Sequence, residues 1–147
     1  MQIIKQIFKK YDIRGLVDSE VTPELAFAVG KGFAALLSQE IHGQMSVAVG
    51  RDMRPSSLEL QALVMDGLMH SGVHVIDIGL VSTPAFYFCV SHTNASGGIM
   101  VSASHNPAAY NGFKLTRARA VPVSGDTGIL ELARIIETEA YLPVVQG

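Results

Sequence analysis

The sequence is short of cysteine and of charge, and it contains no tryptophan. Because Cys89 is the only cysteine, no disulfide can form within the chain, which indicates a reducing, cytoplasmic compartment. A net charge of −2 argues against the basic surface that nucleic-acid binding needs. No apolar run is long enough to cross a membrane, since Lys31 interrupts the best helical candidate, and the first residues lack a signal-peptide core. We expect a cytoplasmic protein that binds neither nucleic acid nor membrane.

Strand and helix patterns alternate along the 147 residues. A helix start is clearest at Thr22-Pro23-Glu24, because Thr caps the first unpaired N–H groups and Pro suits the first turn. Gly43 is the expected end of this helix, and Gly30 and Gly32 inside it would permit close packing on a sheet. We expect the main strands at 45–50, 73–79, 99–101 and 112–116, and helices at 22–43, 57–71, 82–93 and 129–139.

This order of elements predicts an α/β fold: a three-layer α/β/α domain over residues 1–140. Crossover helices imply a small mixed sheet of mostly parallel strands. The last strand follows its neighbour too closely for a crossover helix, so it should run antiparallel. Residues 141–147 have lost periodicity and are expected to form an exit linker.

The most informative stretch is Gly97 to Pro107. Its apolar run indicates a buried strand, and Pro107 stops regular structure, so Ser104 and His105 should lie on a tight loop just past the strand. Open α/β sheets bind ligands at that edge, where a serine can be a nucleophile or carry a phosphoryl group if cations are near. The alternative is an ordinary turn, since Ser, His, Asn and Pro are common turn formers. A hydrolase elbow is disfavoured, because G-x-S-x-G is absent.

Two further segments bring positive charge. Arg14, in Lys9 to Gly15, is either an arginine fork presented to a phosphate or part of a solvated basic edge. The group Arg51, Asp52 and Arg54 lies at another strand-to-helix junction. For that group we favour an internal ion-pair cluster that braces the loop over direct catalysis.

Taken together, these segments resemble the α-D-phosphohexomutases, especially phosphomannomutase/phosphoglucomutase. Any one segment is a weak signal, but the set covers nearly the whole chain and is highly specific. Ser102 is a mild departure, because the family often has Thr there. The matching segments are Tyr11-Asp12-Ile13-Arg14-Gly15, Gly50-Arg51-Asp52-x-Arg54, Ser102-Ala103-Ser104-His105-Asn106-Pro107, Tyr110-Asn111-Gly112-Phe113-Lys114 and Ser124-Gly125-Asp126-Thr127-Gly128.

The resemblance implies an isomerase that interconverts hexose 1-phosphate and hexose 6-phosphate through a bisphosphorylated sugar, activated by a glucose 1,6-bisphosphate-type compound. The serine matching Ser104 carries the phosphoryl group, and Mg²⁺ binds that phosphate and an acidic loop. The residues that match the family's catalytic and substrate-binding positions are Ser104, Lys114, Arg14 and His105 for catalysis, with Tyr11, Asn106 and again Arg14 for substrate binding.

Enzymes of this family have four domains, and the chain resembles the first alone. The acidic Mg²⁺ loop, the sugar-selecting loop and the last phosphate-binding loop belong to the other three. The expected partners are therefore a sugar phosphate and the remaining three domains, and residues 1–147 alone should be inactive. A stand-alone phosphate or sugar-phosphate binding module without turnover is the alternative.

Overall fold

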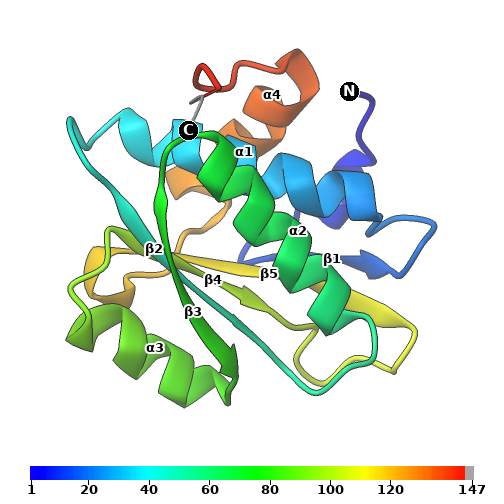
Figure 1. Ribbon diagram of the computed structural model, residues 1–147. Coiled ribbons are helices and arrows are strands. Elements are labelled where there is room, and N and C mark those ends of the chain that lie inside the picture. Colours follow the sequence, from blue (N-terminus) through cyan, green and yellow to red (C-terminus); the bar gives the residue numbers. More distant parts are fainter. Residues whose placement is uncertain (145–147) are drawn as a thin grey trace.

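The computed structural model describes residues 1–144, which form an α/β domain (Figure 1). Within these residues the strands are β1 (Ile13–Leu16), β2 (Ser46–Arg51), β3 (His74–Leu80), β4 (Gly97–Val101) and β5 (Tyr110–Arg117). The α-helices are α1 (Pro23–Ser38), α2 (Ser57–His70), α3 (Thr83–His92) and α4 (Leu130–Thr138), and a short 3-10 turn, η2, spans Ala118–Ala120.

The strands form one mixed sheet in the order β1-β5-β4-β2-β3. β2 pairs in parallel with both β3 and β4, whereas β5 runs antiparallel to β4 and to β1. The predicted mixed sheet with an antiparallel last strand is therefore confirmed. The carboxyl ends of β2 and β4 meet at one edge, where the segments after Arg51 and Val101 lie side by side.

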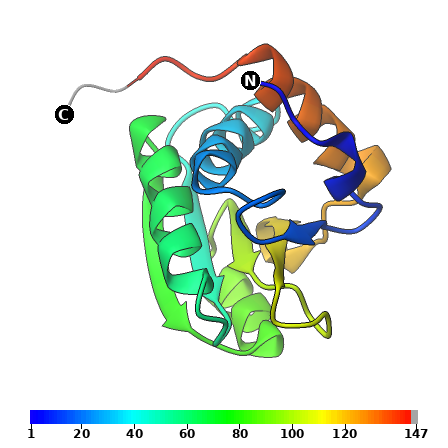
Figure 2. The same ribbon diagram turned by 90° about the vertical axis from the view of Figure 1, so that its right-hand side faces the viewer.

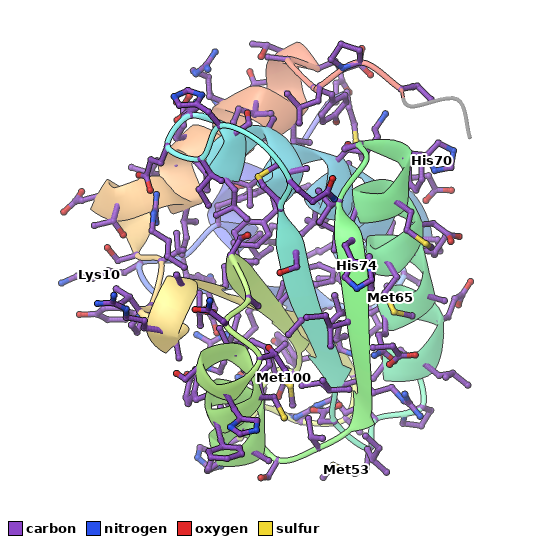
Figure 3. The ribbon with its side chains drawn as sticks, turned by 60° about the vertical axis from the view of Figure 1, so that its left-hand side comes forward. Lys10, Met53, Met65, His70, His74 and Met100 are labelled. Atoms are coloured by element: carbon purple, nitrogen blue, oxygen red, sulfur yellow. The ribbon has the colours of Figure 1, made fainter. Side chains whose placement is uncertain are left out.

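Helices cover both faces of the sheet, which confirms the three-layer α/β/α prediction. α1, α2 and α4 bury the larger core against one face, while α3 packs on β2 and β4 from the other face with η2 beside it. Figures 2 and 3 show α2 and α3 on opposite sides of the strands, with Met65 on α2 and Met100 beneath α3. No helix among residues 1–144 is both long and apolar enough to cross a membrane.

Thr22 caps α1 as expected, its Oγ1 accepting from the Leu25 N–H at 3.1 Å. The expectation that α1 extends to Gly43 was wrong, because the helix ends at Ser38, where the Gln39 N–H bonds the carbonyls of the last turn. Gly30 and Gly32 were also interpreted wrongly, since Gly30 meets α2 and Gly32 meets α4, and neither meets the sheet.

The C-terminal part follows the predicted order. After α4, Glu139 takes a left-handed φ of 54° and ends the helix. Tyr141 and Leu142, the first residues of the predicted linker, are half-buried against the core. Residues 145–147 of that linker lie outside the described residues, and the boundary at residue 140 stays a prediction.

Candidate functional site

Ser104 lies on the loop between β4 and β5 in an unusual backbone conformation. Its φ is 55°, in the left-handed region that a non-glycine residue rarely adopts. Its N–H donates to Oγ of Ser102 at 3.1 Å, and the residue itself is exposed to solvent. Since such a conformation costs on the order of 1–3 kcal/mol, the surrounding structure must hold it.

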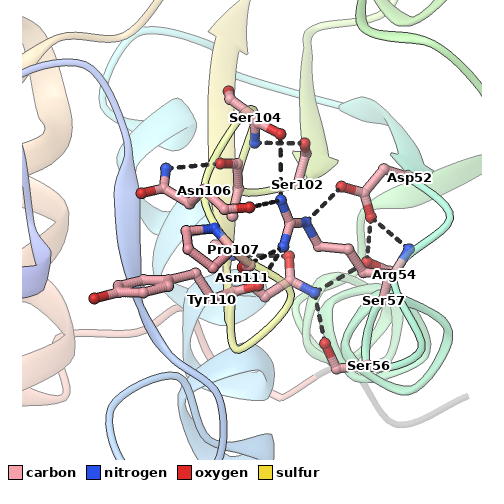
Figure 4. Close-up of polar contacts among 12 residues, drawn as sticks. Asp52, Arg54, Ser56, Ser57, Ser102, Ser104, Asn106, Pro107, Tyr110 and Asn111 are labelled. Atoms are coloured by element: carbon pink, nitrogen blue, oxygen red, sulfur yellow. Dashed lines mark hydrogen bonds and ion pairs between the residues drawn. The ribbon is translucent and has the colours of Figure 1, made fainter.

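The side chain of Arg54 runs beneath this loop and binds its backbone (Figure 4). One terminal nitrogen, Nη2, donates to the carbonyl oxygens of Ser104 at 3.2 Å and Asn106 at 2.6 Å. The other, Nη1, donates to those of Pro107 at 2.7 Å and Tyr110 at 3.1 Å. The guanidinium of Arg54 therefore donates hydrogen bonds to four carbonyl oxygens of the same loop.

Asp52 anchors that arginine. Its Oδ2 accepts from Nε of Arg54 at 3.2 Å, and its Oδ1 accepts from the Arg54 N–H at 3.1 Å and from Oγ of Ser57 at 2.6 Å. The buried amide of Asn111 donates to Oγ of Ser57 at 2.9 Å, and also to Oγ of Ser56. The loop after β4 is therefore tied to the start of α2 and to β5 by one polar network (Figure 4).

Ser104, His105 and Lys114 line one open cleft of about 570 Å³. Lys114 is on β5 opposite Met100 of β4, so its side chain leaves the sheet on the α3 face. Within residues 1–144 the Lys114 ammonium forms no ion pair, and Met53 at the rim is exposed. The cleft thus combines an exposed hydroxyl with an available cation.

Arg14 and Asn106 line a second, smaller hollow of about 250 Å³, and Asn106 directly follows His105 of the cleft. In the β1–β5 pair Arg14 lies opposite Gly112, two residues before Lys114, so both cations leave the same face of the sheet. A Cβ on Gly112 would overlap the carbonyl oxygen of Ile13, so the backbones of β1 and β5 are in close contact there. The structure places Arg14 next to the Ser104 loop but not in the Ser104 cleft.

Tyr11 lines neither hollow. It is 66% exposed, and the ammonium of Lys10 lies 5.3 Å from the centroid of its ring. Within residues 1–144 it is the predicted site residue that lines neither the Ser104 cleft nor the Arg14 hollow.

The residues that the structure describes do not form a metal centre by themselves: no three His, Cys, Asp or Glu side chains are grouped to hold an ion. Asp52 is the carboxylate that lines the Ser104 cleft, and both of its oxygens already accept hydrogen bonds from Arg54 or Ser57. A divalent ion at Ser104 would need ligands beyond this set.

The sequence indicated the ion-pair cluster after β2 but not which residues Arg54 contacts. The predicted cluster is confirmed for Asp52 and Arg54, whereas Arg51 bonds Oε1 of Gln61 at 2.8 Å and forms no ion pair within residues 1–144. Sequence reasoning did not find that Arg54 reaches across to the loop at 104–110. The position of Arg54 after β2, next to the end of β4, was the available signal.

Comparison with known proteins places these features in context. Residues 5–142 match the family model described as phosphoglucomutase/phosphomannomutase, alpha/beta/alpha domain I. The phosphomannomutase of Vibrio cholerae is 42% identical over 93% of this chain and 30% of its own length. A phosphomannomutase sequence from Klebsiella pneumoniae is 41% identical over 93% of this chain and 84% of its own length.

A solved structure shows the same fold. The phosphoglucomutase/phosphomannomutase family protein of Burkholderia thailandensis superposes with a TM-score of 0.87 and 34% identity, covering 97% of this chain and 32% of that one. The chain spans about a third of the length of that protein and of the Vibrio cholerae relative.

Proposed function

Because the chain belongs to the phosphoglucomutase/phosphomannomutase family, as its α/β/α domain I, we propose that it is the phosphoserine-bearing domain of a phosphohexomutase. In this proposal Ser104 carries a phosphoryl group that is exchanged with hexose phosphates. The whole enzyme interconverts hexose 1-phosphate and hexose 6-phosphate, and the isolated chain is inactive.

One observation carries the proposal: the exposed Ser104 hydroxyl is held in a left-handed backbone turn at a cleft that it shares with Lys114. Phosphoryl transfer asks a protein mainly for positioning and for cations around the transferring oxygens. A fixed serine beside an ammonium without an ion pair in residues 1–144 supplies both.

The reaction balances as two transfers. Phosphorylated Ser104 gives its phosphoryl group to a free hydroxyl of the hexose phosphate, so that the bond from Ser104 Oγ to phosphorus breaks and a bisphosphorylated sugar forms. The sugar then turns over, and its other phosphoryl group returns to Oγ. The sugar hydroxyl loses its proton as the new bond forms, and Oγ gains a proton when the second transfer has not yet returned a phosphoryl group to it. Lys114 is either the cation that neutralises charge on the transferring group or the amine that exchanges this proton, and His105 lines the same cleft.

Arg14 and Asn106 are assigned to the sugar phosphate, in the hollow that they line. The arginine fork matches phosphate oxygens in a bidentate way. Tyr11, exposed on the segment before β1, would contact the part of the substrate that extends out of the hollow. A cytoplasmic location and a glucose 1,6-bisphosphate-type activator complete the proposal.

Mg²⁺ enters this proposal through one ligand of the chain, the phosphate on Ser104. Bound there, the ion would neutralise charge on the phosphoryl oxygens. The remaining ligands would come from the other three domains, because Asp52 is occupied by Arg54 and Ser57.

The deciding experiment is a coupled mutase assay on the polypeptide of the complete reading frame that contains this sequence. Mannose 1-phosphate and glucose 1-phosphate are supplied with Mg²⁺ and glucose 1,6-bisphosphate, for the wild type and for Ser104→Ala. Turnover that disappears in Ser104→Ala supports the mutase. Saturable sugar-phosphate binding without turnover in the wild type would instead favour the stand-alone binding module.

A further inference from the structure

We infer that Arg54 is the positioning residue of the Ser104 loop: it sets the backbone geometry of the serine and does not touch the phosphate. The inference rests on the proposed function for its catalytic consequence, and on the hydrogen bonds alone for its structural part. It separates Arg54 from Arg14 and Lys114, which are assigned to the phosphoryl groups.

The guanidinium of Arg54 has no donor left for a ligand. An arginine side chain has five N–H groups and no acceptor. Four of them bind carbonyl oxygens at 104, 106, 107 and 110, and Nε binds Asp52. A phosphate could bind Arg54 only if the loop lost some of these bonds, so its role is to shape the loop.

The bonds fall on both sides of the strained residue. Ser104 is fixed at its N–H by Ser102 and at its carbonyl by Arg54. Two residues on, Asn106 is held by Arg54 at its carbonyl and by the Ala103 carbonyl at its N–H. Holding the peptide units on both sides of Ser104 is what keeps its φ at 55° and its hydroxyl in the cleft.

The arginine itself is rigid. Its side chain is 10% exposed and that of Asp52 is 13% exposed, so their ion pair is shielded from solvent. Asp52 is fixed in turn by Ser57 in the first turn of α2 and by its own N–H, which donates to the Val101 carbonyl at 3.0 Å. The position of the loop is therefore fixed relative to α2 and to the end of β4.

Lysine cannot replace this arrangement, because one ammonium cannot reach four carbonyls and a carboxylate in a planar fork. Arg54→Lys keeps the charge and tests the geometry alone. Arg134→Lys is the matched control, since Arg134 is exposed on α4, where it bonds Glu131, far from the loop in the sequence. Asp52→Asn is the second variant, which weakens the anchor but leaves the four carbonyl bonds possible.

The structural readout is made by NMR on residues 1–147. In Arg54→Lys we expect faster amide exchange at Ser104 and Asn106, and Ser104 carbon shifts that leave the left-handed values, while unfolding stays cooperative. Asp52→Asn should show a smaller change of the same kind, and Arg134→Lys none. Wild-type shifts and exchange at Ser104 in both Arg54→Lys and Asp52→Asn would overturn the inference.

The catalytic readout uses the complete polypeptide. Arg54→Lys should lower kcat by a factor on the order of 10², the cost of a small misplacement of a reacting group, with a much smaller change in KM for the sugar phosphate. Unchanged kcat would overturn the catalytic part. A wild type that is never phosphorylated and never turns over would refute the proposed function instead, and the NMR comparison would still decide the role of Arg54.

Discussion

Gly30 of α1 and Gly67 of α2 face each other where the two helices cross. A Cβ built on Gly30 would lie 3.1 Å from the Cα of Gly67 and would overlap the carbonyl oxygen of Val64. A Cβ on Gly67 would likewise overlap the carbonyl oxygen of Phe27. The helix backbones are therefore in direct contact, and this contact sets how α2 lies over the sheet.

Gly30→Ala should lower the free energy of unfolding. Alanine favours a helix by about 1 kcal/mol over glycine, but the added methyl group must push two backbones apart, and overpacking of this kind costs about 1–3 kcal/mol or more. Urea denaturation measures the net change in the free energy of unfolding. Gly125→Ala is the control, because a Cβ there would lie 3.7 Å from its nearest neighbour. A Gly30→Ala variant as stable as the wild type would show that the helices move apart freely.

Local patterns were enough to predict the order of the elements, but not which surfaces meet. The cap at Thr22 and the apolar face with Val29 and Phe33 indicated α1 correctly. What Gly30 packs against depends on the path of α2, which no local pattern contains. The end of α1 was misplaced for a similar reason: N–H groups of the following turn bind its last carbonyls, so no glycine is needed there.

The site shows the same division. The loop at Ser104 and the cation at Lys114 were predictable, since a strand end and a short connection bring them together. The role of Arg54 was not predictable, because its partners are carbonyl oxygens some fifty residues away in the sequence. Every residue has a backbone carbonyl, so the residue types do not indicate which carbonyls an arginine will bind.

The pH dependence of stability should include a contribution from Glu131. Hydrogen bonds from Arg134 and Gln39 lower the pKa of this carboxyl to about 2. Because the folded pKa is depressed, the contribution is complete above the ordinary value of 4.5 and is lost as the pH falls from 4.5 toward 2. Since Glu131 lies at the surface, the effect should be small and sensitive to salt.

Glu131→Gln tests this by denaturation at several pH values. The variant should lose less stability than the wild type between pH 4.5 and 2, and the two should differ most near neutral pH. An NMR titration that places the Glu131 carboxyl at its ordinary pKa would contradict the expectation.

Lys114→Ala and Arg14→Ala should each lower kcat in the complete polypeptide while the domain stays folded. Losing one positioned contact to a transition state costs a factor on the order of 10²–10³. Lys5→Ala is the control, because that side chain is exposed, pairs with Glu137 and lines neither hollow. Near-normal turnover in both test variants would return Lys114 and Arg14 to the role of surface charges.

Residues 1–147 should fold alone and should not catalyse. The domain has helices on both faces of its sheet and two buried apolar clusters, which is what independent folding needs. Circular dichroism should show one cooperative thermal transition, and the coupled assay should show no turnover with either sugar phosphate. Robust turnover by this chain would mean that the minimal catalytic unit is smaller than proposed.

The central claim is that Ser104 carries the phosphoryl group, and phosphopeptide mapping tests it most directly. The complete polypeptide is treated with glucose 1,6-bisphosphate and Mg²⁺, digested and analysed by mass spectrometry. Ser102 lies only two residues before Ser104, so fragmentation of the peptide must separate these two serines. The account predicts one phosphate, on Ser104, and none in Ser104→Ala. Phosphate on Ser102, or no phosphate on the loop, would contradict it.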